Sequence, residues 1–60
     1  NDGDALNLEL NSLKAWLAEH DYMVNKFILG EYEATDLRWI AYLEERAAVL
    51  VRINEIEALL

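Results

Sequence analysis

Residues 6–27, LNLELNSLKAWLAEHDYMVNKF, decide the fold of this chain. Positions that alternate four and three residues apart are apolar there, apart from one histidine: Leu6, Leu10, Leu13, Leu17, His20, Val24 and Phe27. This heptad spacing is typical of a helix that packs along one side against another helix. Trp16, Met23 and Ile28 widen the stripe, as expected for a bundle helix with two neighbours.

A second stripe of the same kind occupies the other half of the chain. Its heptad positions are Trp39, Leu43, Arg46, Leu50, Ile53, Glu57 and Leu60. Apolar residues widen it on both flanks, Ile40 and Ala47 on one, Tyr42, Val49 and Ile56 on the other. Each stripe predicts a helix of about 25 residues, or roughly 37 Å at the α-helical rise.

Gly30 separates the two stripes in a chain without proline. A glycine at this place is predicted to end the first helix in the left-handed conformation. Thr35 is expected to cap the second helix, with Asp36 in its first turn. Asp2 or Asp4 is expected to cap the first helix. The sequence therefore predicts an all-α fold in one domain, an antiparallel αα-hairpin whose turn runs from Gly30 to Thr35.

Folding the chain near its midpoint predicts which positions face each other. Residues whose numbers sum to about 66 share a level in an antiparallel pair. This register places Phe27 against Trp39 and His20 against Arg46, and we expect the latter two to form a polar layer that fixes register and oligomeric state. An alternative seam would leave Arg46 at its edge. It would run through Ile40, Leu43, Ala47 and Leu50.

Two helices are too few to cover stripes of this width. An isolated hairpin is expected to leave a contiguous apolar surface in water, and such surfaces usually mark an interface. It would contain Trp16, Met23, Ile40, Val49 and Ile56. A chain of 60 residues without cysteine also lacks disulfides and thiolate metal sites to support a small core.

We therefore expect a homodimer in a four-helix bundle, with docking on a larger, different protein as the alternative. The predicted oligomer interface comprises Leu10, Leu13, Trp16, Leu17, His20, Met23, Val24, Ile40, Leu43, Arg46, Ala47, Val49, Leu50, Ile53 and Ile56. Tyr22 and Tyr32 lie off both stripes, and they are candidates for contacts with another protein because tyrosine often anchors interfaces.

The composition leaves little basis for catalysis. His20 has acidic neighbours on both sides, but successive helical residues point about 100° apart and cannot converge on one metal. Ser12 lies about 12 Å along the helix from His20, too far for a hydrogen bond. Glu44 and Glu45 diverge in the same way. We expect no enzymatic activity, no cofactor and no metal site.

The charge balance narrows the class of partner. The chain has 12 acidic and 5 basic residues and a formal net charge of -7, which disfavours binding to a phosphate backbone. The acidic residues are spread widely, which favours a solvated surface. An acidic inhibitor or mimic that binds a basic site on a partner is the alternative. The predicted architecture also resembles the plasmid RNA-binding Rop type, although no basic face is visible, so RNA binding is a third alternative.

The sequence shows no sign of a membrane-spanning segment or a targeting segment. The longest runs without a charged residue are five residues long, far short of the roughly 20 that a span requires. The acidic start of the chain is unlike a secretory or transit segment. We expect no membrane association.

Several short stretches resemble small helical proteins of bacteria and their prophages. They are Asp21-Tyr22, Lys26, Gly30-Glu31-Tyr32, Glu45-Arg46 and Arg52-Ile53-Asn54-Glu55-Ile56-Glu57. The resemblance covers most of the chain after residue 12 and implies a helical accessory or assembly protein, with no functional residue carried over. We therefore expect a small acidic structural or protein-interaction module, located in the cytoplasm or in a phage particle.

Overall fold

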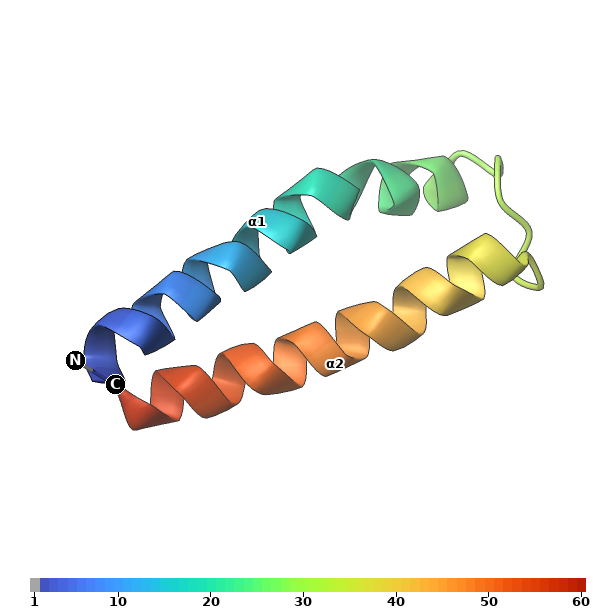
Figure 1. The fold of residues 1–60 in the computed structure, drawn as a ribbon. Helices are drawn as coiled ribbons and strands as arrows, with labels where there is room; N and C mark the ends of the chain where they lie inside the picture. The colour runs from blue at the N-terminus through green and yellow to red at the C-terminus, as the bar shows by residue number, and fades with distance from the viewer. Residues whose placement is uncertain (1) are drawn as a thin grey trace.

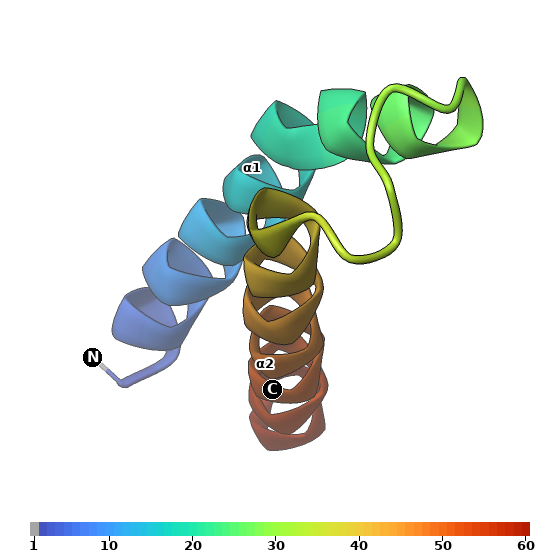
Figure 2. The same ribbon diagram turned by 90° about the vertical axis from the view of Figure 1, so that its right-hand side faces the viewer.

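The computed structural model describes residues 2–60 and shows two antiparallel helices joined by a short turn (Figure 1). Helix α1 spans Asp2–Ile28 and helix α2 spans Leu37–Leu59. Their lengths are 27 and 23 residues, close to the prediction. Figure 2, which looks along α2, shows that α1 crosses it at an incline. The predicted all-α hairpin is confirmed.

Gly30 ends α1 as the sequence predicts. Its φ is 79°, in the left-handed region. The N–H of Glu31 donates to the carbonyl of Lys26 at 2.8 Å, and the N–H of Gly30 donates to that of Phe27 at 3.0 Å. This pair of bonds is the Schellman motif, which satisfies the last carbonyls of a helix. A Cβ at Gly30 would meet no atom within 4 Å, so the backbone conformation, not space, requires glycine.

The start of α2 differs from the prediction by one residue. The N-cap is Asp36, whose carboxylate accepts a hydrogen bond from the Arg38 N–H at 2.8 Å. The Arg38 guanidinium also donates to the same carboxylate at 3.1 and 2.8 Å. These bonds hold the Asp36 side chain in the capping position, so the assignment of the cap to Thr35 was wrong. The hydrogen bonds from Arg38 lower the pKa of Asp36 to about 2.

The predicted caps of α1 are also corrected. Asp2 and Asp4 lie inside the first turn of the helix. A carboxylate there stabilises the helix by interacting with the positive end of the helix dipole, but it does not occupy the capping position. The position before Asp2 falls outside the described residues.

Replacing the observed cap should destabilise the hairpin more than replacing the predicted one. Asp36→Ala removes an acceptor from the first turn of α2 and is expected to lower the melting temperature by about 5 °C. Thr35→Ala should change it little. Because the Asp36 pKa is lowered from 3.8 to about 2, its stabilising effect is present above pH 3.8 and is lost as pH falls toward 2. Circular-dichroism melts at pH 7 and pH 2 test both points. A larger decrease in melting temperature for Thr35→Ala than for Asp36→Ala would contradict the assignment of Asp36 as the cap.

The core of residues 2–60 consists of two clusters along the hairpin. The cluster near the chain ends contains Leu10, Val49, Ile53 and Ile56, with Leu6, Leu13, Trp16 and Leu17 packed against it. The cluster near the turn contains Met23, Trp39 and Tyr42, with Trp16, Val24, Phe27 and Tyr32 packed against it. The rings of Phe27 and Trp39 stack with centroids 4.3 Å apart, which confirms the predicted register at this level.

The seam of α2 uses the flank that contains Tyr42, Val49 and Ile56. Met23, Val49 and Ile56 were expected to remain in water in a single hairpin, but they are buried inside it, and Ile56 is 0% exposed. The helix turns Trp39 and Tyr42 toward α1, because aromatic side chains bury more apolar area there than a seam containing Ala47 would. The residues Ile40, Leu43 and Ala47 are therefore left exposed.

Candidate interaction face and central pocket

An apolar face remains uncovered along one side of the hairpin. We call it the open face, and it consists of Leu17, Val24, Ile40, Leu43, Ala47 and Leu50. Leu17, Val24 and Leu50 are half-buried, Ala47 is exposed, and Ile40 and Leu43 are 37% and 44% exposed. The set draws on both helices and includes a heptad-spaced row on α2.

One ion pair shows that these residues lie on the same side of both helices. Lys14 Nζ lies 3.9 Å from a carboxylate oxygen of Glu57. Leu43, Leu50 and Glu57 are spaced by seven residues, so they form one row along α2. Lys14 lies three residues before Leu17, on the neighbouring row of α1. The open face is therefore continuous across the groove between the helices.

The opposite side of the hairpin is closed by a stronger ion pair. The Arg52 guanidinium donates to both carboxylate oxygens of Glu9, at 2.6 and 2.9 Å, and lies 3.6 Å from Glu55. The hydrogen bond from Arg52 lowers the pKa of Glu9 below its usual value. Sequence reasoning missed this pair. The sequence does contain a signal for it, because Glu9 and Arg52 have opposite charges and lie only a few residues from facing positions in the predicted register.

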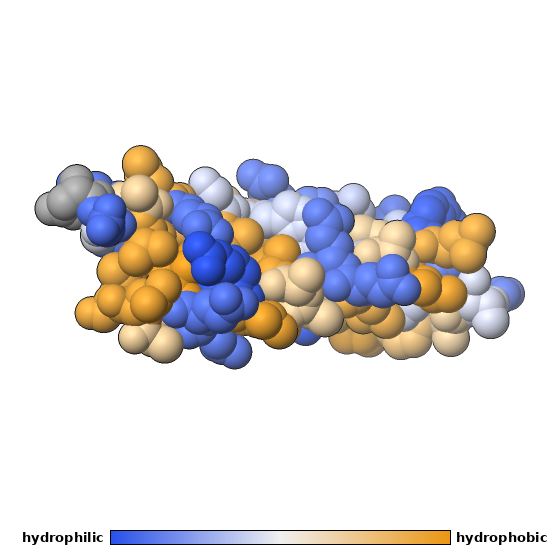
Figure 3. All heavy atoms as spheres, turned by 60° about the horizontal axis from the view of Figure 1, so that its bottom comes forward, coloured by the Kyte–Doolittle hydropathy of each residue, from blue (hydrophilic) through white to orange (hydrophobic). Residues whose placement is uncertain are grey.

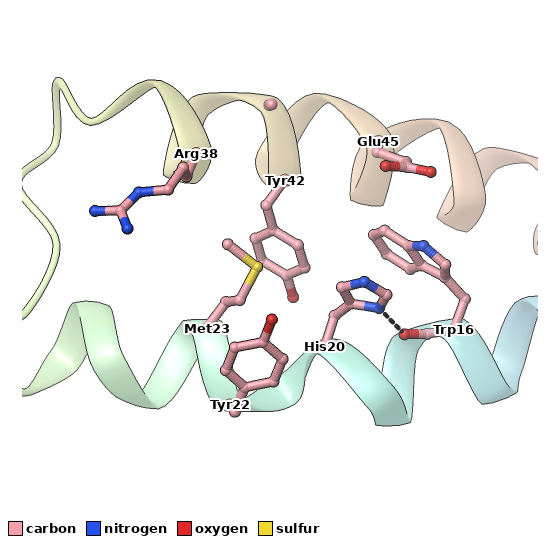
Figure 4. A pocket seen from close by; sticks show the side chains of 8 residues that line it. Trp16, His20, Tyr22, Met23, Arg38, Tyr42 and Glu45 are labelled. Atoms are coloured by element: carbon pink, nitrogen blue, oxygen red, sulfur yellow. Dashed lines mark hydrogen bonds between the residues drawn. The ribbon is translucent and has the colours of Figure 1, made fainter.

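A pocket of about 240 Å³ lies between the two helices, beside the core cluster near the turn (Figure 4). It is lined by Trp16, His20, Tyr22, Met23, Arg38, Ala41, Tyr42 and Glu45. Figure 4 shows Tyr42 reaching from α2 toward α1. The Tyr42 hydroxyl is buried and has no hydrogen-bond partner among the described residues. The pocket is therefore a place where packing between the helices is incomplete.

The expected polar layer of His20 and Arg46 does not form. His20 turns back along α1, where its Nδ1 donates to the Trp16 carbonyl at 2.7 Å and its ring stacks on the Trp16 ring at 4.3 Å. Arg46 is exposed. The imidazole is satisfied by its own helix, and the long arginine side chain can reach water. Along α2, Arg46 falls between the buried residues Tyr42 and Val49 at the same heptad spacing, but it is not buried itself. The two core clusters are therefore separated at its position.

Aromatic rings and cations gather at the turn. The Arg38 guanidinium lies 5.0 Å from the centroid of the Tyr32 ring, and Lys26 Nζ lies 5.8 Å from the same ring. Lys26 also lies 5.9 Å from the Tyr22 ring. Tyr32 is half-buried and packs against Trp39, whereas Tyr22 is 53% exposed. Tyr22 is thus the more accessible of the two predicted partner contacts.

The structure divides the predicted interface residues into three groups. Those buried inside the hairpin are Leu10, Met23, Val49, Ile53 and Ile56. The half-buried residues are Leu13, Trp16, Leu17, His20, Val24 and Leu50. The exposed residues are Ile40, Leu43, Arg46 and Ala47. Only the half-buried and exposed residues can contact another molecule directly, because the buried residues pack inside the hairpin.

Most other exposed apolar side chains lie toward the two ends of the hairpin, and Val51 in α2 is an exception. In Figure 3, hydrophobic surface is visible at both ends of the hairpin, with hydrophilic side chains between them. Near the chain termini, Leu8, Leu59 and Leu60 are 57% to 69% exposed, and at the turn end Ile28, Leu29 and Leu37 are 73% to 80% exposed. Unlike the open face, the leucines at the chain termini do not form a heptad row along the middle of the hairpin.

The described residues contain neither a metal-binding cluster nor a membrane-spanning helix. Across residues 2–60, no group of three or more metal-ligating side chains could hold a metal ion. Neither described helix contains an apolar segment long enough to cross a bilayer. Comparisons with protein-family models, curated proteins and solved structures find nothing similar.

Proposed function

We propose that this chain is a small structural module that associates with a second copy of itself through the open face and forms a four-helix bundle. The observation that carries the proposal is the uncovered row of Leu43 and Leu50 beside Ile40 and Ala47, continuous with Leu17 on α1. A two-fold axis would place the open face of one copy against that of the other. Each copy would then cover the apolar surface that the other exposes.

The shape of the hairpin supports this proposal. Its radius of gyration is 13.9 Å, compared with about 10 Å for a compact domain of this length. The chain exposes 4409 Å², compared with about 4,000 Å² for a compact monomer of its mass. A full side of the hairpin measures 44 × 16 Å, so two copies packed along their whole length would bury at most about 1,400 Å² in total, within the range of specific interfaces.

The charged side chains favour a protein partner over RNA. Lys14, Arg38 and Arg52 are in ion pairs with carboxylates, and Lys26 lies over tyrosine rings. These cations are distributed over both sides of the hairpin and the turn, so they form no stripe that could follow a phosphate backbone. The resemblance to prophage proteins and the expected location in the cytoplasm or a phage particle stay predictions.

A dilution series of thermal melts tests the proposed function. If dissociation and unfolding are coupled, the melting temperature rises with protein concentration, because mass action favours the associated state. Melts should therefore be recorded by circular dichroism over at least a hundredfold range of concentration. A cooperative melt at one temperature throughout that range would contradict self-association.

A further inference from the structure

Two opposite charges border the open face. Arg46 is three residues after Leu43 and four before Leu50, so its Cα lies between theirs on α2. Asp21 is four residues after Leu17 and three before Val24, in the corresponding place on α1. Both side chains are exposed, and neither has an ion-pair or hydrogen-bond partner among residues 2–60. Each charge is thus available to a second molecule.

Asp21 and Arg46 also share a level near the middle of the face. The residue numbers of Asp21 and Arg46 have nearly the same sum as those of Phe27 and Trp39, whose stacked rings show that positions with this sum face each other. Arg46 lies beside the midpoint of the stripe from Ile40 to Leu50. Rotation about a two-fold axis through the centre of this face therefore moves these charges little along the bundle.

Two hairpins can pack face to face with two-fold symmetry in two ways. If the axis runs along the helices, both turns lie at the same end and α1 of each copy packs against α2 of the other. Asp21 then faces Arg46 of the second copy, and this contact forms twice. If the axis runs across the helices, the turns lie at opposite ends and like helices meet. Arg46 then approaches Arg46 of the second copy, and Asp21 approaches Asp21.

We propose that Asp21 and Arg46 fix the orientation of the dimer, with both turns at the same end and α1 of each copy against α2 of the other. This inference rests on the proposed self-association. Like charges brought together in an apolar interface suppress the wrong arrangement, and opposite charges favour the right one. The central charges therefore select one arrangement over the other.

The charges near the chain ends support the same orientation. Lys14 and Glu57 lie on the rows of Asp21 and Leu50, and they face each other across the groove at 3.9 Å. With both turns at the same end, Lys14 also faces Glu57 of the second copy. In the opposite orientation it would face the turn half of α1, where Ile28 occupies its row. The orientation thus keeps every charge on this face next to an opposite one.

A distance between spin labels tests the orientation directly. The chain has no cysteine, so Thr35→Cys in the exposed turn introduces a single attachment site in each copy. We expect a short distance by double electron–electron resonance, of about 20 to 25 Å between the labels, because the two α2 helices lie diagonally in the bundle, about 14 Å apart. In the opposite orientation, with the axis at the level of Arg46, Thr35 of each copy lies 11 residues from the axis. The labels would then be separated by about 30 to 35 Å, and that result would overturn the proposal.

Charge reversal tests the contribution of the two residues. Asp21→Lys places two cations opposite each other, and Arg46→Glu places two anions together, so each should weaken dimerisation by about tenfold or more. The double variant Asp21→Lys/Arg46→Glu restores opposite pairs and should regain most of the affinity. Glu19→Lys makes the same charge change on the other flank of α1 and serves as the control. Single variants with unchanged affinity would overturn the proposal.

The two experiments separate the orientation from the association itself. A dimer with distant labels would overturn the orientation and leave the proposed function standing. A protein that stays monomeric at every concentration would overturn both.

Discussion

Ile56→Ala is expected to abolish most of the folded hairpin. Ile56 is 0% exposed and belongs to the cluster with Leu10, Val49 and Ile53. Removing a buried side chain of this size costs about 2 to 5 kcal/mol, since the lost transfer energy is increased by the cavity left behind. A single core in a chain this short rarely supplies more than about 3 to 5 kcal/mol. The substitution therefore removes nearly the whole stability.

The helical signal in circular dichroism at room temperature measures this effect. Leu59→Ala provides a matched control, because Leu59 is three residues further along α2 and 66% exposed. Its substitution should change the free energy of unfolding by about 0.5 kcal/mol or less. An Ile56→Ala variant with a cooperative melt close to that of the wild type would show that Ile56 is not at the centre of the core.

Leu43→Glu is expected to abolish self-association while leaving the hairpin folded. Leu43 is 44% exposed in one hairpin, so a glutamate there can extend into water. In the dimer, the two-fold axis would bury two such carboxylates in an apolar interface, and unpaired buried charges are very costly. We expect the dissociation constant to rise by about 100-fold or more. Sedimentation velocity over a concentration series gives this value.

The control for this experiment uses the same substitution on the other flank of α2. Leu59 lies on the row of Arg52, which pairs with Glu9 on the side opposite the open face. Leu59→Glu should leave the dissociation constant nearly unchanged. Equal effects of the two substitutions, or a Leu43→Glu dimer as tight as the wild type, would contradict the assignment of the open face.

Sequence patterns predicted the elements of the fold but not which flank of α2 packs against α1. The heptad spacing predicted both helices, and Gly30 predicted the turn, because these signals depend on local geometry. The stripe on α2 is apolar on both flanks, so spacing alone allowed several seams. The area buried by Trp39 and Tyr42 decides among them, and it depends on the facing residues of α1.

The polar residues of the site were the hardest to place. His20 and Arg46 interrupt the two stripes at the same level, and the sequence therefore suggested a shared layer. A carbonyl four residues back satisfies His20 instead, and the stacked Trp16 ring offers it a surface. Such local contacts compete with contacts between helices, and spacing gives no information about which will form.

The pairing of charges was also beyond the sequence pattern. Arg52 reaches Glu9, and Lys14 reaches Glu57, each several residues from the level that the register assigns. Long side chains extend along the groove, so the partner of a charge at the edge of a seam depends on side-chain length and on the inclination of the helices. The same limits hid the open face, since its extent depends on which flank α2 buries.

Sedimentation equilibrium of the wild-type chain at micromolar concentrations tests the central claim most directly. Self-association through the open face predicts a mass of twice the 6.9 kDa of one chain, falling toward the chain mass on dilution. A single species of 6.9 kDa at every concentration, with a cooperative melt, would contradict it.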